Sequence, residues 1–179
     1  HQSHSCMEPM NATVHVRPDD TVEVWAPSQG PQVHRQFAKN LGIPEKEAED
    51  KIKVHLPFIG GGFGRRGMND PLEECFQISE KLRKPVKLIW TREDDTSQGP
   101  FRQGTIHAMK AVFDANGNPT GMQHKMVSQA ITTQSRPSPD KIPFEVMEGI
   151  NTHYEFEDFS VEFGEYKSQI PVHWWRSVF

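Results

Sequence analysis

The 179-residue chain lacks a long apolar run and a cluster of positive charge, the features that would indicate a membrane or a nucleic-acid partner. No stretch reaches the ~18 consecutive apolar residues of a membrane-spanning helix, so we expect no transmembrane segment. The formal net charge is -4, from 20 basic and 24 acidic side chains. Nucleic-acid surfaces need a basic patch or stripe, so the sequence predicts no nucleic-acid partner.

Cysteine is also scarce, because the chain holds only Cys6 and Cys75 and no C-x-x-C pair. Cys75 is expected to be a small buried residue on an apolar helix face rather than a reactive thiol. The nine histidines form no H-x-x-x-H or H-E-x-x-H pair, and His15, His107 and His124 are expected to point out of strands. The sequence therefore predicts no metal-ligating set, and no carboxylate stands out as a catalytic acid or base.

Glycine, by contrast, is concentrated in one stretch, Gly60-Gly-Gly-Phe-Gly-Arg-Arg-Gly67, which follows the apolar run that begins at Ile52. Glycines are expected where the backbone needs a positive φ or where a ligand approaches main-chain amides. The next residues, Met68-Asn-Asp-Pro71, predict a helix start with Asn69 or Asp70 as N-cap. A strand, an amide-rich turn and a helix N-terminus in succession are suited to binding an anionic group.

The first half of the chain predicts a small sheet with helices. A strand ending at Val16 and a second at 21–26 form a hairpin, and a helix at 32–41 is closed by Gly42. A strand at 52–57, a helix at 71–83 and a strand at 85–90 then predict a βαβ crossover that is parallel and right-handed. The charged connection at 43–50 is expected to hold one short helical turn.

The second half predicts a long hairpin, with strands at 105–113 and 121–129 around the Asn116-Gly117 turn. A loop at 130–140 and a half-exposed strand at 154–163 follow. The fold class is therefore α+β, with mixed sheets, the βαβ crossover, two main helices and about eight strands. We expect one domain over 1–179, which could divide into a 1–100 part with the crossover and a 101–179 part with the hairpin.

Two motifs have alternative interpretations. Gly62-Phe-Gly-Arg-Arg-Gly67 matches the G-x-G-x-x-G pattern of dinucleotide-binding dehydrogenases, but its third glycine precedes the predicted helix start. A scaffold domain in which the turn only reverses the chain is a further alternative. Trp174-Trp175-Arg176 either fills the edge of a core or lines a pocket in which the arginine holds an anion, and composition does not decide between them.

Four linked motifs resemble one enzyme family. Met7-Glu-Pro-Met10, Trp25-Ala-Pro-Ser-Gln29, the glycine run through Arg66, and Trp175-Arg-Ser-Val178 occur in the order and spacing of the large subunit of isoquinoline 1-oxidoreductase-like enzymes. These belong to the molybdenum hydroxylases, with xanthine dehydrogenase and aldehyde oxidase as relatives. The resemblance covers essentially the whole chain and implies the molybdopterin-binding type of fold.

The resemblance implies a molybdopterin cofactor with molybdenum, usually in the cytosine dinucleotide form. Gln29 matches a glutamine that hydrogen-bonds a molybdenum oxo group, and Phe63 matches a residue whose N–H reaches the apical oxygen and whose ring borders the substrate pocket. Arg176 matches the arginine of a second cofactor-binding loop. The cofactor-binding residues implied are Gln29, Gly61, Gly62, Phe63, Gly64, Arg65 and Arg176.

By the same resemblance, the parent enzyme hydroxylates N-heterocyclic aromatics or oxidises aldehydes with oxygen from water, and passes electrons to [2Fe-2S] centres on a partner subunit. Gly67 stands where xanthine-oxidising relatives have a glutamate, so xanthine is not an expected substrate. Phe179 stands where the family often has glycine. The catalytic base of the family lies beyond Phe179, so we expect a piece of a larger subunit that neither holds the cofactor nor turns over substrate alone. The compartment and the substrate stay open.

Overall fold

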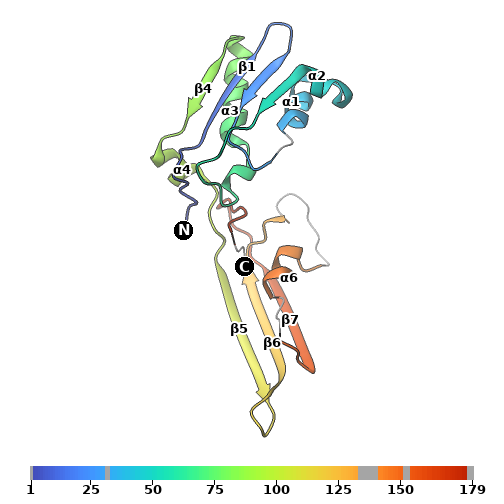
Figure 1. The fold of residues 1–179 in the computed structure, drawn as a ribbon. Helices are drawn as coiled ribbons and strands as arrows, with labels where there is room; N and C mark the ends of the chain where they lie inside the picture. The colour runs from blue at the N-terminus through green and yellow to red at the C-terminus, as the bar shows by residue number, and fades with distance from the viewer. Residues whose placement is uncertain (1, 31–32, 133–140, 151–153, 177–179) are drawn as a thin grey trace. The chain divides into compact units, whose positions relative to one another are not determined.

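The structure is a computed structural model that describes residues 2–30, 33–132, 141–150 and 154–176. The chain divides into two compact units, shown from blue to red in Figure 1. The N-terminal unit is Ser3–Gly99, and the C-terminal unit begins at Pro100 and also includes Gln2. Each unit is described by itself below.

The N-terminal unit is built on a four-stranded sheet in the order β3-β2-β1-β4. Its strands are β1 (Asn11–Val16), β2 (Val22–Trp25), β3 (Ile52–His55) and β4 (Val86–Ile89). β1 pairs antiparallel with both β2 and β4, and β3 pairs parallel with β2. The predicted hairpin of β1 and β2 is thus confirmed.

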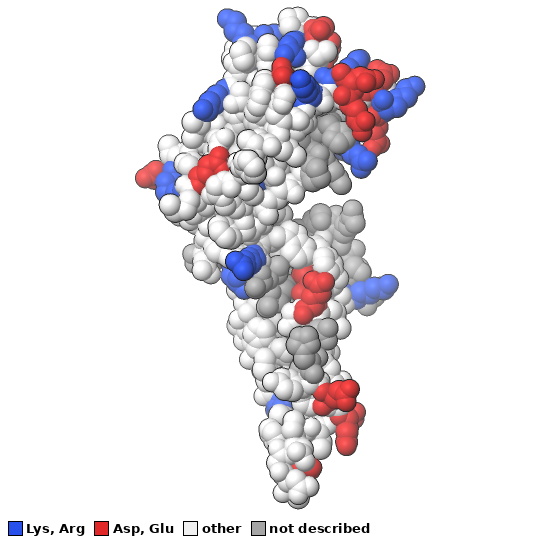
Figure 2. Space-filling model, in the orientation of Figure 1, with Lys and Arg blue, Asp and Glu red and all other residues white. Residues whose placement is uncertain are grey.

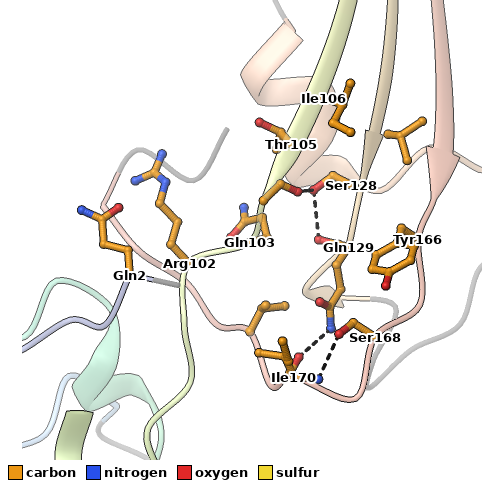
Figure 3. Close-up of a pocket in the computed structure, with 13 residues that line it drawn as sticks. Gln2, Arg102, Gln103, Thr105, Ile106, Ser128, Gln129, Tyr166, Ser168 and Ile170 are labelled. Atoms are coloured by element: carbon orange, nitrogen blue, oxygen red, sulfur yellow. Dashed lines mark hydrogen bonds between the residues drawn. The ribbon is translucent and has the colours of Figure 1, made fainter. Parts of the chain in front are cut away.

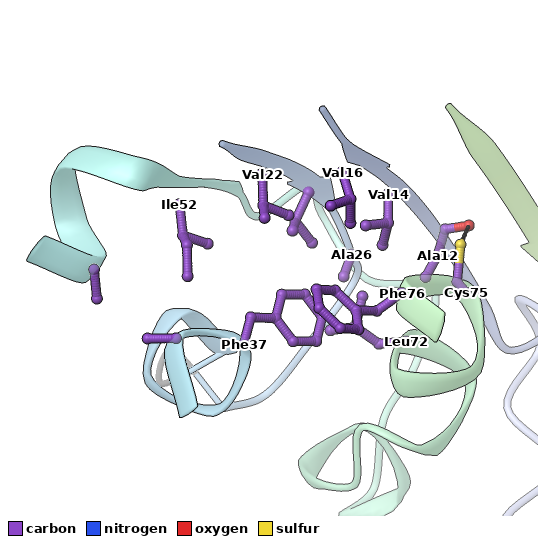
Figure 4. Packing of buried hydrophobic residues seen from close by; sticks show 13 residues of the cluster. Ala12, Val14, Val16, Val22, Ala26, Phe37, Ile52, Leu72, Cys75 and Phe76 are labelled. Carbon is purple, nitrogen blue, oxygen red and sulfur yellow. Dashed lines mark hydrogen bonds between the residues drawn. The ribbon is translucent and has the colours of Figure 1, made fainter. Parts of the chain in front are cut away.

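Alternation of apolar residues in β1 and β2 places their valines on one face, where α1 (Val33–Leu41) and α3 (Asp70–Leu82) pack. Phe37 of α1 and Phe76 of α3 stack with ring centroids 4.4 Å apart against these valines (Figure 4). Cys75 is fully buried in the same cluster, as predicted, and burial raises the pKa of its thiol. The two main helices expected from the sequence are therefore the ones that cover this sheet.

The β3-α3-β4 segment is a parallel crossover, as predicted. β3 runs parallel to β2, and both β2 and β4 run antiparallel to β1, so β3 and β4 point the same way. They lie at opposite edges of the sheet, however, so α3 connects strands separated by β2 and β1 rather than neighbours. The sheet is mixed, unlike the all-parallel sheet of a doubly wound dinucleotide-binding fold.

The charged connection holds the short helical turn that the sequence predicts, as η1 (Glu45–Glu47) and α2 (Ala48–Lys51). Other short helices were not predicted, and the first of these is η2 (Arg65–Gly67), in which the glycine turn ends. After β4 comes α4 (Arg92–Gln98), which begins at a capping box formed by Thr91 and Asp94. In the C-terminal unit, α6 (Phe144–Ile150) follows the predicted loop, of which residues 133–140 lie outside the described chain.

The C-terminal unit is a three-stranded sheet in the order β5-β6-β7. β5 (Thr105–Phe113) and β6 (Pro119–Ser128) form the predicted antiparallel hairpin, with Gly117 at φ +85° in its turn. β7 (Asp158–Glu165) begins four residues later than expected and pairs parallel with β6. α6 packs on one face of this sheet, where Met126, Val146 and Ile150 form a small core.

The described part of the chain has seven strands rather than eight, and it holds no helix with the length and apolarity needed to cross a bilayer. Acidic and basic side chains are interspersed on the face shown in Figure 2. The expectation that His124 points to solvent is wrong, because the residue is buried. It lies on the same face of β6 as Met126, on which α6 packs. His15 is half-buried.

Candidate functional site

The glycine turn between β3 and α3 has the backbone conformation that its composition predicts. Gly61 and Gly64 have φ values of +97° and +100°, which residues other than glycine rarely adopt. Phe63 lies between them at φ +54°, a left-handed conformation that costs a residue other than glycine roughly 1–2 kcal/mol. Local strain of this kind is found at ligand-binding segments, so the turn is a candidate binding site.

Only part of the turn's backbone is engaged by the protein itself. The N–H of Gly60 donates to Oε2 of Glu8 (2.7 Å), that of Gly64 to Oε1 of Gln29 (3.0 Å), and that of Arg65 to the carbonyl of Gly62 (2.8 Å). Within the described chain, no group accepts from the three successive N–H groups between these, which are those of Gly61, Gly62 and Phe63. These three donors are therefore available to a ligand.

Gln29 lies directly against the turn. Its own N–H donates to the carbonyl of Arg66 (2.9 Å), and its side-chain oxygen accepts from Gly64. Because the oxygen is held by Gly64, the side-chain NH₂ points the other way, and in the described chain it has no acceptor. A Cβ on Gly62 would lie 2.4 Å from Oε1 of Gln29, so only glycine at position 62 allows this close approach.

Arg66 holds the turn to two other segments. Its side chain is 1% exposed, and its guanidinium donates to the carbonyls of Gly61 (2.8 Å), Pro27 (3.3 Å) and Glu8 (2.9 Å) and to the carboxylate of Glu8 (3.0 Å). Guanidinium donors are arranged in a rigid plane, so these contacts fix the relative positions of all three segments. Arg66 thereby places Gln29 beside the free amides.

The segment Cys6–Glu8 lies along the turn. The buried thiol of Cys6 donates to the carbonyl of Gly62 (3.4 Å), and burial raises the pKa of this thiol, which keeps the donor protonated. Burial alone would raise the pKa of Glu8 as well. The hydrogen bonds from Gly60 and Asn11 and the charge of Arg66 outweigh that effect and lower it. Glu8 is therefore an ionised anchor for the start of the turn.

Arg65, which the resemblance gives as a cofactor-binding residue, makes contacts inside the protein. Its guanidinium is 1% exposed and donates two bonds to the carboxylate of Asp70 (2.7 and 2.6 Å), with Nε 3.6 Å from Oδ1 of Asp95. It also lies over the Trp90 ring, 5.5 Å from the centroid. The backbone N–H of Arg65 donates to Gly62 and its guanidinium is paired with two carboxylates of the protein, so Arg65 is engaged internally. Among the described buried side chains, its Nε has no hydrogen-bond partner.

Exposed apolar side chains border the turn. Phe63 is 45% exposed, and Phe58 is fully exposed in the segment that leads from β3 into the glycines. Ile59 is also exposed. Sequence reasoning identified Phe63 but missed Phe58 and Ile59, although an apolar run continuing up to a glycine turn was a usable signal.

The structure describes Arg176 within the C-terminal unit. The residue is exposed, and its carbonyl accepts from Nη1 of Arg102 (3.4 Å). The adjacent Trp174 ring packs on Phe144 at the start of α6, with centroids 5.5 Å apart. Ser177, Val178 and Phe179, which complete the predicted second loop, lie outside the described residues.

A cavity of about 620 Å³ lies in the C-terminal unit, where β5 begins and β6 ends (Figure 3). Ile106, Val127 and Tyr166 contribute to its wall, and Gln129 donates from its side chain to the carbonyl of Ile170 (3.0 Å). Arg102 is the only charged side chain among the described residues that line it. These residues therefore provide no acid and base pair of the kind a hydrolytic site needs.

The chemistry of the turn fits an anionic or oxo-bearing group. Three successive backbone donors and an outward side-chain NH₂ all offer hydrogen to oxygen atoms, and no carboxylate is left unpaired beside them. The described residues contain no group of three or more His, Cys, Asp or Glu side chains that could hold a metal ion. A metal at this site would therefore have to arrive within a larger cofactor that brings its own ligands.

Comparison with known proteins gives three results. A family model described as "Molybdopterin cofactor-binding domain" matches residues 1–174. The isoquinoline 1-oxidoreductase subunit beta of Brevundimonas diminuta is 36% identical over 126 residues, which is 69% of this chain and 16% of that protein. The membrane-bound aldehyde dehydrogenase [pyrroloquinoline-quinone] of Gluconacetobacter polyoxogenes is 34% identical over 124 residues, which is 68% of this chain and 15% of that protein.

Among solved structures, quinoline 2-oxidoreductase from Pseudomonas putida 86 superposes with a TM-score of 0.77 at 21% identity. The alignment covers 98% of this chain and 22% of that one. Aldehyde oxidoreductase from Desulfovibrio gigas superposes with a TM-score of 0.71 at 15% identity, over 97% of this chain and 18% of that one. These similarities establish the fold, and the chain spans about a sixth of the length of the curated relatives.

Proposed function

The chain belongs to the molybdopterin cofactor-binding domain family, and we propose that its glycine turn holds molybdopterin in an enzyme that hydroxylates N-heterocyclic aromatics or oxidises aldehydes. The observation that carries the proposal is the run of three unpaired N–H groups, Gly61 to Phe63, beside the outward NH₂ of Gln29. Donors fixed in advance stabilise charge without reorganising, so a rigid turn suits a highly charged centre.

Each residue of the turn has a separate role in this proposal. The N–H groups of Gly61, Gly62 and Phe63 and the side-chain NH₂ of Gln29 donate to oxygen atoms of the cofactor. Gly64 orients Gln29 through the bond to Oε1. Arg65 contributes indirectly, because its bonds to Asp70 tie the turn to the start of α3.

When bound, the cofactor supplies the redox chemistry by which oxygen from water is transferred to a substrate carbon. This chain's own residues position it and shape the approach of the substrate. The exposed rings of Phe58 and Phe63 offer flat apolar surfaces that favour planar aromatic substrates and displace water. The chain contributes no residue that we assign to proton transfer, so the base comes from the rest of the subunit.

The finer features follow the resemblance of the four motifs. We propose the cytosine dinucleotide form of the cofactor, with Arg176 binding one of its anionic groups from the second loop. Electrons would leave to [2Fe-2S] centres on a partner subunit, which agrees with the "subunit beta" in the name of the isoquinoline 1-oxidoreductase relative. The 179-residue chain alone should turn over no heterocycle or aldehyde.

Replacement of Gly62 tests the proposal without disturbing the fold. A Cβ at position 62 would meet the flexible end of Gln29, so Gly62→Ala should displace that side chain rather than the backbone. In the complete subunit, made in a host that synthesises the cofactor, we expect the molybdenum and pterin content to fall at least tenfold. Gly104→Ala is the matched control, because its Cβ would meet no atom within 4 Å.

Two results would count against the proposal. Wild-type subunit from a cofactor-competent host that contains no molybdenum would favour a scaffold domain. Full molybdenum content in both Gly62→Ala and Gln29→Ala would show that the turn does not hold the cofactor. Release of a cytosine nucleotide on acid treatment of the wild-type subunit would separately test the form of the cofactor.

A further inference from the structure

Two histidines in the C-terminal unit form a pair that the proposed function does not use. His107 of β5 and His124 of β6 lie on adjacent antiparallel strands, with Nδ1 of His107 2.8 Å from Nε2 of His124. Their ring centroids are 5.1 Å apart at an angle of 39°. In this contact one ring nitrogen donates its proton to the lone pair of the other, so both nitrogens face the same point. A small cation at that point would be bound by both lone pairs once the donor ring carries its proton on its other nitrogen.

The strand register surrounds this pair with methionines. Met126 lies directly opposite His107, and Met109 lies directly opposite His124. Residues two apart in a strand share a face, so all four side chains lie on the same face of the sheet. Cross-strand partners have Cβ atoms roughly 5 Å apart. The result is a square in which each histidine has a methionine across from it and another beside it.

The square has an open side and a closed side. His107 is exposed and Met109 is 58% exposed, whereas His124 is 6% exposed. Met126 is buried in the small core beneath α6 together with Val146. An ion can therefore enter from the exposed β5 side and reach the His124 nitrogen.

The donor set favours a soft cation. Lys125 and Glu162 pair with each other on the opposite face, so within the described strands the register places no carboxylate in the square. Imidazole and thioether ligands together select Cu(I), whereas hard divalent ions need oxygen ligands.

We propose that His107, His124 and Met109 form a binding site for one cuprous ion. With metal–nitrogen bonds of about 2.0 Å, a trigonal arrangement needs the two nitrogens about 3.5 Å apart. The present 2.8 Å separation reaches that value by a small rotation of the exposed His107 ring. The Met109 thioether completes the set from the open side.

The experiment titrates the whole 179-residue chain anaerobically with Cu(I), using methyl-¹³C methionine and ¹⁵N histidine labels. We expect the Met109 methyl and the ring nitrogens of His107 and His124 to shift together, saturating at one ion per chain. Met7, which is 89% exposed in the other unit, should not shift. Shifts confined to His4, or spectra that report thiolate ligation by Cys6 or Cys75, would overturn the assignment.

Three variants measure the affinity against a competing cuprous chelator. His107→Gln and Met109→Leu change exposed side chains and should each weaken binding at least tenfold, while circular dichroism stays unchanged. Met7→Leu is the matched thioether control and should alter the affinity less than twofold. Equal affinity in all of them, or tighter binding of Zn²⁺ than of Cu(I) at the same residues, contradicts the proposal. No molybdopterin is present, so either outcome leaves the proposed function untouched.

Discussion

At the scale of single residues, the adjacent arginines Arg65 and Arg66 determine the shape of the glycine turn without facing a ligand. Arg65 is held by carboxylates, and Arg66 is held mainly by backbone carbonyls. Both guanidinium groups are buried, so loss of the groups that hydrogen-bond either arginine should strongly destabilise the fold. Two arginines in a glycine-rich stretch predict anion binding from the sequence. The residues that pair with them, such as Glu8, are too distant in the chain for local patterns to indicate.

We expect Glu8→Gln to lower the free energy of unfolding of the N-terminal unit by about 1–3 kcal/mol at pH 7, because Arg66 loses a charged acceptor. The pKa of Glu8 is lowered from 4.5, so its contribution is fully present above pH 4.5 and is lost as the pH falls through the lowered value. The difference between wild type and variant should therefore shrink in acid.

Urea unfolding at pH 7 and pH 3, followed by the amide signals of β1, measures this difference. Glu49→Gln, at an exposed position in α2, is the matched control and should change little at either pH. If the difference in the free energy of unfolding between wild type and Glu8→Gln were as large at pH 3 as at pH 7, the charge of the Glu8 carboxylate would not be what stabilises the unit.

At the scale of elements, those with strong local signals were predicted, whereas the polar helix α4 was not. α3 was predicted because Pro71 follows its N-cap and apolar residues recur at helical spacing. α4 was missed because its residues are polar, although Thr91 and Asp94 form the spacing of a capping box. The position of β3 at the sheet edge beside β2 depends on tertiary packing, which no local pattern encodes.

The capping box of α4 gives a prediction at this scale. The hydroxyl of Thr91 accepts a hydrogen bond from the backbone N–H of Asp94 (3.1 Å). The backbone N–H of Thr91 in turn donates to the carboxylate of Asp94 (3.0 Å). Thr91→Ala should cost about 1 kcal/mol, while Thr91→Ser keeps the hydroxyl and should cost much less. Hydrogen exchange of the α4 amides reports the loss, and equal protection in both variants would show that the cap is not what stabilises this helix.

At the scale of the whole molecule, each unit has a hydrophobic core of its own. The larger core joins β1, β2, α1 and α3, and the smaller one joins α6 to β6 and β7. The composition of the chain indicated the glycine turn, and the resemblance of the four motifs implied Gln29. The sequence could not show that Arg65 is engaged internally, nor that His107 and His124 meet across a hairpin, because both depend on how separate segments pair.

Because the two cores are separate, a substitution in one core should destabilise its own unit and leave the other unit unchanged. Phe76→Ala should destabilise the N-terminal unit by about 3–5 kcal/mol, because it removes a ring that is 1% exposed and stacked on Phe37. Ile78 of the same helix is 41% exposed, so Ile78→Ala should lower the free energy of unfolding much less. Hydrogen exchange in the full chain should show faster exchange in β1 and β2 and unchanged rates in β6. An equal loss in β6 would show that the two cores unfold as one.

The contacts of Arg66 also bear on protein engineering. Its guanidinium reaches the backbone of Glu8, Pro27 and Gly61, which are far apart in the sequence. A glycine loop grafted onto another scaffold would therefore need the segments of Glu8 and Pro27 as well. Without them, Arg66 would lack the carbonyl groups that fix the conformation of the loop.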